Sequence, residues 1–513
     1  TVKGANFNIK GDAALQAGDK LNLDTIETQN KEHYVSNADN YYKLDQKQEV
    51  GSQLNVTGNL DAVGKSAVEM RGVSVTSNGT MNVLSDGNIN VQEARYKEQL
   101  SSASKGKSRG LTSSTTEVYR HKHNYDTAEA SNLDADKINL HSNNGNVTIQ
   151  GSNVAAGNGL TVKAKNIDIR EAENRVYSDD YYSKKKSGML GGGIGVTFGS
   201  QKQTTESDQT KLYAQGSQVG SLNGNTTMIA ENTYTQTASK VSAIKDGDVN
   251  ILAKKVDIKA ADDKYETNTK QKFEQKGLTI AITSPVISAM QAAQGAVQST
   301  RQVGESKHGR VNAMAAANAG FDAYRAAQSV GQAANDVGKF MSDTGNVDSV
   351  IGVQITYGQQ KNESRTHTEG KTAYKSQVNA GGKVNIMATR AGKDSNINIE
   401  GSDISGKQGT TLIADNQVNI KAIEENHQER STNKSRGFNA GVAIKVSNSE
   451  AAGVTLGGNY GKGYGNGDET TYVASHVGDS QSKTVIHAGG DANIIGSQVK
   501  GKRVEVNAQN LNI

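Results

Sequence analysis

The sequence of 513 residues has no cysteine, no tryptophan and a single proline. Without cysteine the chain can form no disulfide, no thiolate metal site and no cysteine nucleophile, which suits a protein that is exported unfolded. Hydrophobic residues make up only 34% of the sequence, so a thick globular core is not expected. No signal peptide is visible, and no apolar run reaches the roughly 18 residues that a membrane-spanning helix needs.

The chain also lacks a strong charge of either sign. Its formal net charge is +4, and lysines alternate with acidic residues along the whole sequence. A nucleic-acid-binding domain usually concentrates basic residues on one face or segment. We therefore expect no nucleic-acid partner.

A short repeat takes the place of a globular pattern. Residues 396–424, NINIEGSDISGKQGTTLIADNQVNIKAIE, contain three alternating strands separated by a Gly-Ser corner and a turn. Residues 146–172, NVTIQGSNVAAGNGLTVKAKNIDIREA, repeat this plan nearly step for step. Weaker copies occupy residues 54–94, 212–260 and 485–513.

The period of the repeat predicts the fold. The step from Ile149 to Ile169 is 20 residues, and the step from Ile399 to Ile420 is 21. Short strands at this period are typical of a solenoid, in which each coil buries its inward face on its neighbours. We predict an all-β, right-handed parallel β-helix, because crossovers between parallel strands are almost always right-handed. About eleven coils would make a rod roughly 50 Å long.

This rod is expected to be one elongated body over residues 1–513, with five lateral excursions. The pattern starts and ends in mid-repeat, so we expect the sequence to be part of a longer protein and to perform only part of that protein's function. The excursions are polar segments in which the repeat is interrupted. They lie at about 24–51, 93–134, 171–211, 261–374 and 423–484.

Three of the excursions contain apolar alternation with a period of two, which predicts β-hairpins with one apolar face and strands of about ten residues. The fourth also contains an Ala- and Gln-rich insert at 284–343. Ser284 as N-cap with Pro285 in the first helical position, followed by apolar stripes at spacings of three and four, predicts a helical hairpin there.

Two arrangements of the hairpins are open. They form an accessory sheet whose apolar faces are packed away in the resting state, or they enter a bilayer as paired strands. The two are compatible if buried hairpins are released later. The candidate membrane-engaging residues are Leu190, Ile194, Val196, Phe198, Leu278, Ile280, Ile282, Ile351, Val353, Ile355, Tyr357, Phe438, Val442, Ile444, Val446, Val454 and Leu456.

Other candidate sites are weak. His121 and His123 share a strand face but have no visible third metal ligand. The glycine runs at 191–195 and 457–467 lack the Lys-Ser or Lys-Thr and the strand-to-helix context of a phosphate loop. Neighbouring acids such as Asp179 and Asp180 are typical of charged turns. We expect no enzyme activity, no catalytic residue, no metal and no cofactor.

The motifs carry a family resemblance. Coils ending in N-I-x-G-S-x-[VI] and V-x-I-x-A are followed by excursions with K-S-x-G-x-x-x-G-[VI] at 434–442 and a degenerate copy of it at 186–194. Over essentially the whole chain this resembles the haemagglutinin repeats of filamentous haemagglutinin-like exoproteins. The greatest similarity is to the second repeat region of contact-dependent growth inhibition effectors, the CdiA family of two-partner secretion systems.

The resemblance implies a filament that is secreted or displayed on the surface of a Gram-negative bacterium, with an outer-membrane secretion partner for the parent protein. For the second repeat region it implies toxin delivery at the target cell's outer membrane. The alternative is an adhesin shaft that binds a receptor on a host or neighbouring cell. Insertion of the hairpins into lipid would favour delivery, whereas saturable binding without insertion would favour adhesion.

Overall fold

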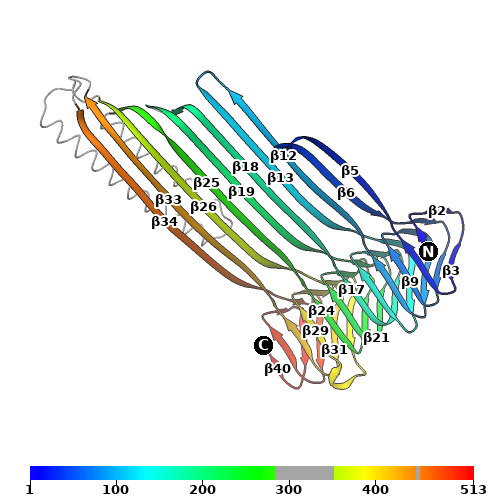
Figure 1. The fold of residues 1–513 in the computed structure, drawn as a ribbon. Helices are drawn as coiled ribbons and strands as arrows, with labels where there is room; N and C mark the ends of the chain where they lie inside the picture. The colour runs from blue at the N-terminus through cyan, green and yellow to red at the C-terminus, as the bar shows by residue number, and fades with distance from the viewer. Residues whose placement is uncertain (193–194, 284–351, 446–450) are drawn as a thin grey trace.

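The described strands form two sheets: a coil, and a sheet of long hairpins that project away from the coil and follow one another along it (Figure 1). The computed structural model describes residues 1–192, 195–283, 352–445 and 451–513. Thirty strands form a parallel sheet that winds nearly closed around a narrow core, and ten form an antiparallel sheet beside it. The predicted parallel solenoid is confirmed, while its handedness stays a prediction. The helical hairpin expected at 284–343 lies outside the described residues.

The coil has three stacks of parallel strands, because each turn of the chain adds a strand to each stack. Strands β10, β14, β17 and β21 turn a corner and belong to two stacks. A short 3-10 helix, η2 (Gly392–Asp394), lies in one loop. The coil strands are β1 (Val2–Lys3), β2 (Asn6–Ile9), β3 (Ala13–Ala17), β4 (Lys20–Asp24), β7 (Gln53–Val56), β8 (Leu60–Gly64), β9 (Ala67–Arg71), β10 (Ser74–Ser85), β11 (Asn88–Gln92), β14 (Asn132–Ser142), β15 (Asn146–Gln150), β16 (Asn153–Ala156), β17 (Leu160–Arg170), β20 (Gln218–Ser221), β21 (Thr226–Thr237), β22 (Lys240–Ala243), β23 (Val249–Ala253), β24 (Lys255–Lys259), β27 (Gln377–Ala380), β28 (Lys383–Ala388), β29 (Ile397–Glu400), β30 (Asp403–Gly406), β31 (Gly409–Ala414), β32 (Val418–Lys421), β35 (His476–Val477), β36 (Lys483–Ala488), β37 (Ala492–Ile495), β38 (Gln498–Val499), β39 (Arg503–Asn507) and β40 (Leu511–Asn512).

The core is built by the residues that define the sequence repeat. Ile149 pairs with Ile169, and Ile399 pairs with Ile420, so the period of 20 or 21 residues is the step from one coil to the next. These four isoleucines are fully or almost fully buried. Each coil therefore completes its core only by stacking on its neighbours, as expected for a solenoid.

One corner of the coil is held by buried serines. Gly401 turns it with a φ of +54°, and a Cβ there would lie 2.4 Å from the Ile423 side chain, so only glycine fits. The following Ser402 donates its backbone N–H to the Oγ of Ser475 in the next coil, at 3.0 Å. Ser475 Oγ donates in turn to the Lys421 carbonyl at 2.7 Å. Equivalent Ser-to-Ser bonds join Ser152, Ser217, Ser239 and Ser376.

The antiparallel sheet consists of five hairpins that leave the coil at this corner. Its strands are β5 (Ile26–Asn37), β6 (Asn40–Val50), β12 (Ala94–Arg109), β13 (Ser113–Glu129), β18 (Ala172–Gly192), β19 (Gly195–Gln215), β25 (Ala261–Thr283), β26 (Gly352–Tyr374), β33 (Ile423–Lys445) and β34 (Ala451–Val473). The strand length of about ten residues expected from the apolar alternation is wrong, since β18 has 21 residues and β25 has 23. The polar inner halves of these strands carry no hydrophobic pattern that would reveal them.

The hairpins lie side by side in chain order along the coil (Figure 1). Two coils separate each hairpin from the next: β7–β9 with β10–β11, β14–β15 with β16–β17, β20–β21 with β22–β24, and β27–β29 with β30–β32. Neighbouring strands lie about 4.8 Å apart in either sheet type. The two strands of a hairpin therefore occupy the same width as two coils, and the sheet runs parallel to the coil without gaps.

The serine corner gives a testable prediction. Replacing the fully buried Ser475 with alanine leaves the Ser402 N–H and the Lys421 carbonyl without this partner. We expect a loss of about 1–3 kcal/mol in the free energy of unfolding, measured by urea denaturation. Ser405→Ala, on the outer surface of β30, is the matched control. Equal stabilities of the two variants would contradict a structural role for the serine corner.

Candidate functional site at the far end of the hairpin sheet

The end of the hairpin sheet that is remote from the coil contains the strands predicted to be apolar. In an antiparallel sheet, residues directly opposite one another share a face, and successive residues alternate between faces. Phe198 pairs with Leu278, and Leu278 pairs with Tyr357, so these three side chains lie on one face, called face A. Thr197 and Thr279 lie on the opposite face, called face B.

Two rows of apolar residues cross face A. One row consists of Met189, Phe198, Leu278, Tyr357, Ala440 and Leu456. The next consists of Val196, Ile280, Ile355, Val442 and Val454. Val353 and Phe438 flank these rows on the same face, and the Phe438 ring lies 6.3 Å from the Tyr357 ring. We call this whole set the apolar patch.

The structure gathers most of the predicted membrane-engaging residues, although they come from five different strands, β19, β25, β26, β33 and β34. The patch contains Val196, Phe198, Leu278, Ile280, Val353, Ile355, Tyr357, Phe438, Val442, Val454 and Leu456. Ile282 and Ile444 pair with Val353 in the register, and only their backbone is described. Ile194, Ile351 and Val446 lie outside the described residues.

One predicted residue lies on the wrong face for this group. Leu190 pairs with Thr197 and therefore belongs to face B. Its neighbour Met189 pairs with Phe198 and joins the patch, which the sequence analysis missed. The sequence has two adjacent apolar residues before a glycine run and does not indicate which of them lies on face A. Only the register between the strands decides this.

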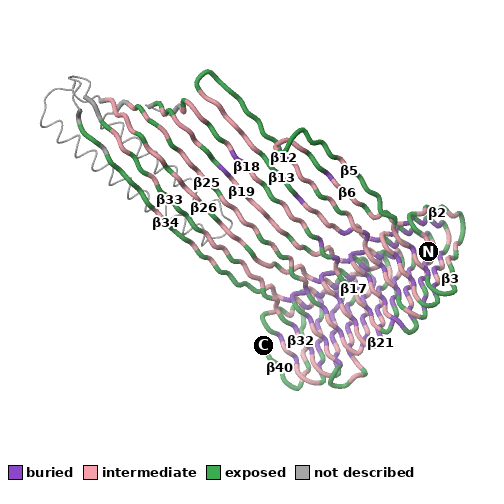
Figure 2. The backbone as a smooth tube through the Cα atoms, viewed as in Figure 1, coloured by how far each residue is buried: buried purple, intermediate pink, exposed green. Residues whose placement is uncertain are grey.

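The patch is accessible and one-sided. Phe438 is 50% exposed, Val454 is 73% exposed and Leu456 is 82% exposed. Figure 2 shows buried backbone gathered in the coil, whereas the hairpin sheet is half-buried or exposed over most of its length. From Val353 to Phe438 the apolar patch spans about 20 Å along the strands, and it spans about 24 Å across them. A continuous apolar surface of this size is typical of a docking or membrane-contact site.

Face B is smooth and polar at the same level. A row of glycines crosses it, comprising Gly188, Gly199, Gly277, Gly358 and Gly457, with Asn439 between the last two. A threonine row lies next to it, and Thr197 and Thr279 hydroxyls lie 2.9 Å apart. The part of these rows from Gly277 to Gly457, with Thr197 and Thr279, lines a shallow depression of about 650 Å³. The far end of the sheet is therefore amphipathic.

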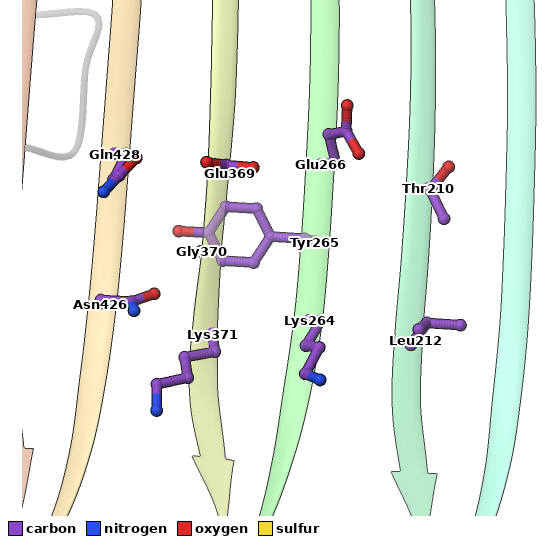
Figure 3. Close-up of a pocket in the computed structure, with 10 residues that line it drawn as sticks. All are labelled: Thr210, Leu212, Lys264, Tyr265, Glu266, Glu369, Gly370, Lys371, Asn426 and Gln428. Carbon is purple, nitrogen blue, oxygen red and sulfur yellow. The ribbon is translucent and has the colours of Figure 1, made fainter.

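A second depression, of about 420 Å³, lies nearer the coil (Figure 3). Two rows of face A border it: Glu266, Glu369 and Gln428 in one, and Lys264, Lys371 and Asn426 in the other. The Tyr265 ring lies across Gly370, and its hydroxyl is 2.5 Å from His427 Nδ1. Burial raises the pKa of Tyr265, so the hydroxyl stays protonated near neutral pH.

His121 and His123 belong to a chain of hydrogen bonds that crosses four strands on face B. Asp180 Oδ1 lies 2.6 Å from His121 Nδ1, and His121 Nε2 lies 3.0 Å from His123 Nδ1. His123 Nε2 lies 2.6 Å from Glu98 Oε1, and Tyr96 donates to the other oxygen of Glu98 at 2.5 Å. One of the two facing ring nitrogens must donate and the other must accept, so the pair is expected to hold one proton between its rings.

In this chain of hydrogen bonds, Glu98 is the carboxylate with the most hydrogen-bond partners. Partial burial alone would raise its pKa, but hydrogen bonds from Tyr96, Gln46 and His123 outweigh burial and lower the pKa. The arrangement therefore holds β6, β12 and β13 together through an ionised carboxylate. It resembles a structural clamp more than a metal site, and the described residues contain no group of three or more His, Cys, Asp or Glu suited to a metal.

The clamp predicts a pH dependence. Because the folded pKa of Glu98 is lowered, its contribution to stability is present above the unfolded value of about 4.3 and is lost as the pH falls through the folded pKa. We expect Glu98→Gln to lose about 1–3 kcal/mol at pH 7 in urea unfolding, and this loss to shrink below about pH 4. Glu27→Gln, in an exposed ion pair, is the control. A loss that does not change with pH would contradict the clamp.

Comparison with known proteins agrees with this architecture. The Hemagglutinin repeat family model matches residues 112–272 and 357–513. The chain is 30% identical to Deoxyribonuclease CdiA of Yersinia pseudotuberculosis over 381 residues, which cover 73% of the chain and 33% of that protein. It is 31% identical to 16S rRNA endonuclease CdiA of Enterobacter cloacae over 422 residues, covering 80% and 12%. It is 29% identical to tRNA nuclease CdiA of Escherichia coli strain STEC_O31 over 443 residues, covering 84% and 13%.

The chain thus spans a third or less of the length of these relatives. No solved structure matches it. In the described part of the chain, no helix has the length and apolar character to span a membrane. The family match covers more than half of the sequence and both sheets of the structure. The chain therefore belongs to the hemagglutinin-repeat family, the CdiA- and filamentous haemagglutinin-like exoproteins that Gram-negative bacteria secrete and display at their surface.

Proposed function

We propose that this chain is a non-enzymatic segment of a CdiA-like exoprotein that acts at the outer membrane of a target cell during contact-dependent toxin delivery. The observation that supports this proposal is the apolar patch on face A, which is exposed, continuous and backed by a polar face. The coil serves as a rigid base that holds the hairpins in one plane. The patch is the part that contacts lipid.

The relatives' names support a role in a toxin system. The three relatives are named as a deoxyribonuclease, a 16S rRNA endonuclease and a tRNA nuclease. All three nevertheless contain a region that is similar to the present sequence. One repeat region that accompanies different nucleases fits a shared delivery function. We therefore assign the nuclease activities to parts of those proteins outside the matched regions. The parent protein would reach the cell surface through an outer-membrane secretion partner.

The dimensions of the patch favour contact with one leaflet by the sheet as it stands. The apolar patch spans about 20 Å along the strands, less than the roughly 30 Å of a bilayer core. Strands β5 and β34 also form open edges, and unpaired backbone groups are costly in hydrocarbon. We propose that face A rests in the outer leaflet, with face B toward water. Any deeper insertion would need a partner strand at each edge.

A pair of neighbouring residues provides the test. Leu278 lies on face A and Thr279 lies on face B of the same central strand, β25. Placing a charge at Leu278 costs about 1.5–3 kcal/mol of apolar contact and adds the cost of burying a carboxylate, so Leu278→Asp should lower binding to outer-membrane vesicles at least tenfold. Thr279→Asp should bind as the wild type does. Vesicle flotation measures both.

Protease digestion of the floated complexes adds the location of the contact. Protection of peptides from the ends of β19, β25, β26 and β33 would support the proposal, provided that circular dichroism shows the same β-sheet content in both variants. Equal flotation of the two variants would contradict it. Saturable binding to whole cells, with no lipid protection of these strands, would favour the adhesin shaft instead.

A further inference from the structure

On the coil side of the apolar patch, face A carries two rows of basic residues. The first row contains Lys185, Lys202, Lys361 and Arg436, with Glu274 as its only carboxylate. The next row contains Lys272, Lys434 and Lys462, with Glu363 as its only carboxylate. These seven cations are called the basic belt. The first of the two rows lies four residues, or about 14 Å, from the row of Leu278 and Tyr357.

The two carboxylates neutralise only part of this charge. Lys361 Nζ lies 2.9 Å from Glu274, and Lys272 Nζ lies 3.5 Å from Glu363. Of the remaining cations, Lys434, Arg436 and Lys462 line a depression of about 470 Å³, together with the two ion pairs. Lysine and arginine groups that converge on a hollow of this size are suited to phosphate oxygens. The belt therefore has a surplus of positive charge and a concave place for an anion.

The basic charge is concentrated on face A. On the coil side of the belt, the next row of face A carries Lys270 and Arg365 with Glu206. The row after it carries Asp179 and Asp208 with Arg430, and the third row is acidic, with Glu266, Glu369 and Asp468. On face B, the row between the two belt rows is largely neutral, with Gln203, Phe273, Asn362 and Ser435 after Lys184. Lys184 itself is paired with Glu117 at 2.6 Å. Along its length, face A thus changes from apolar to basic and then to rows of mixed charge.

Tyrosines mark the same level. Tyr460 lies in the first belt row beside Arg436, and Tyr464 lies one row behind the belt; both are about four-fifths exposed. Tyrosine is enriched at the boundary between hydrocarbon and headgroups, because its ring is apolar and its hydroxyl is polar. A lipid leaflet presents acyl chains, then the boundary with the headgroups, then anionic phosphates. The apolar patch, the tyrosines and the long basic side chains follow one another in the matching order.

We propose that the basic belt binds the phosphate groups of anionic lipids while the apolar patch contacts their acyl chains, so that face A lies flat on an anionic membrane surface. This inference rests on the proposed function and adds the chemistry of the partner and the orientation of the sheet. Charge complementarity carries it: the belt faces the phosphates, and the acidic row of Glu266, Glu369 and Asp468 stays beyond the edge of the contact.

The test compares vesicles of defined composition. We expect the protein to float with phosphatidylcholine vesicles that contain phosphatidylglycerol or lipid A, and to bind pure phosphatidylcholine much more weakly. Binding to the anionic vesicles should fall as salt rises from 0.05 to 0.5 M, because the Debye length shrinks from about 14 to about 4 Å. Neutralising Lys185, Lys202 and Lys434 together with glutamine should lower partitioning on the order of 100-fold, at about fivefold per cation. This triple variant keeps the two ion pairs of the belt.

A matched pair of single variants controls for general charge effects. Lys185→Glu alters the belt, whereas Lys186→Glu makes the same change one residue away on face B. Only the first should weaken binding to anionic vesicles. Equal effects of the two variants, or equal binding to neutral and anionic vesicles without salt dependence, would overturn the belt and leave the proposed membrane role standing. Flotation with no vesicle of any composition would overturn both.

Discussion

The spacing between neighbouring β-strands is the constraint on which the architecture depends. Coil strands and hairpin strands are both about 4.8 Å apart from their neighbours. Each hairpin adds two strands to the sheet, and two coils separate one hairpin from the next. The coil and the sheet therefore gain the same length with each repeat. A hairpin after every coil would crowd the sheet, and one after every third coil would leave strands unpaired. The buried serines fix the place where each hairpin leaves and returns, and so keep the two sheets in step.

The coil could be predicted from the sequence in some detail, because its strands alternate between a buried and an exposed side. The match of Ile149 with Ile169, and of Ile399 with Ile420, gives the register directly. The pairing of the hairpins with one another could not be predicted. Their inner halves are polar on both faces, so no hydrophobic period indicates a partner, and the sheet is specified by cross-strand pairs such as Lys361 with Glu274 and by the spacing of the coils.

The candidate site was predictable as a set of residues but not as a surface. Period-two alternation identified residues such as Leu278 and Val442, and the register showed that they share a face. Alternation could not decide between Met189 and Leu190. The basic belt was hidden for a different reason. Its lysines come from six strands far apart in the sequence, and a net charge of +4 averages them with the acidic residues of the whole chain.

The hairpins differ in length, from 12 residues in β5 to 23 in β25, although all leave the same corner of the same coil. Both ends of a hairpin are anchored at the coil, so its tip can be lengthened or trimmed without disturbing the core. Side chains change face with every residue, and residues added between the coil and the basic belt therefore keep the apolar and basic groups on face A only if their number is even. The reach of the sheet can thus evolve in steps of about 7 Å, while the coil that carries it remains unchanged.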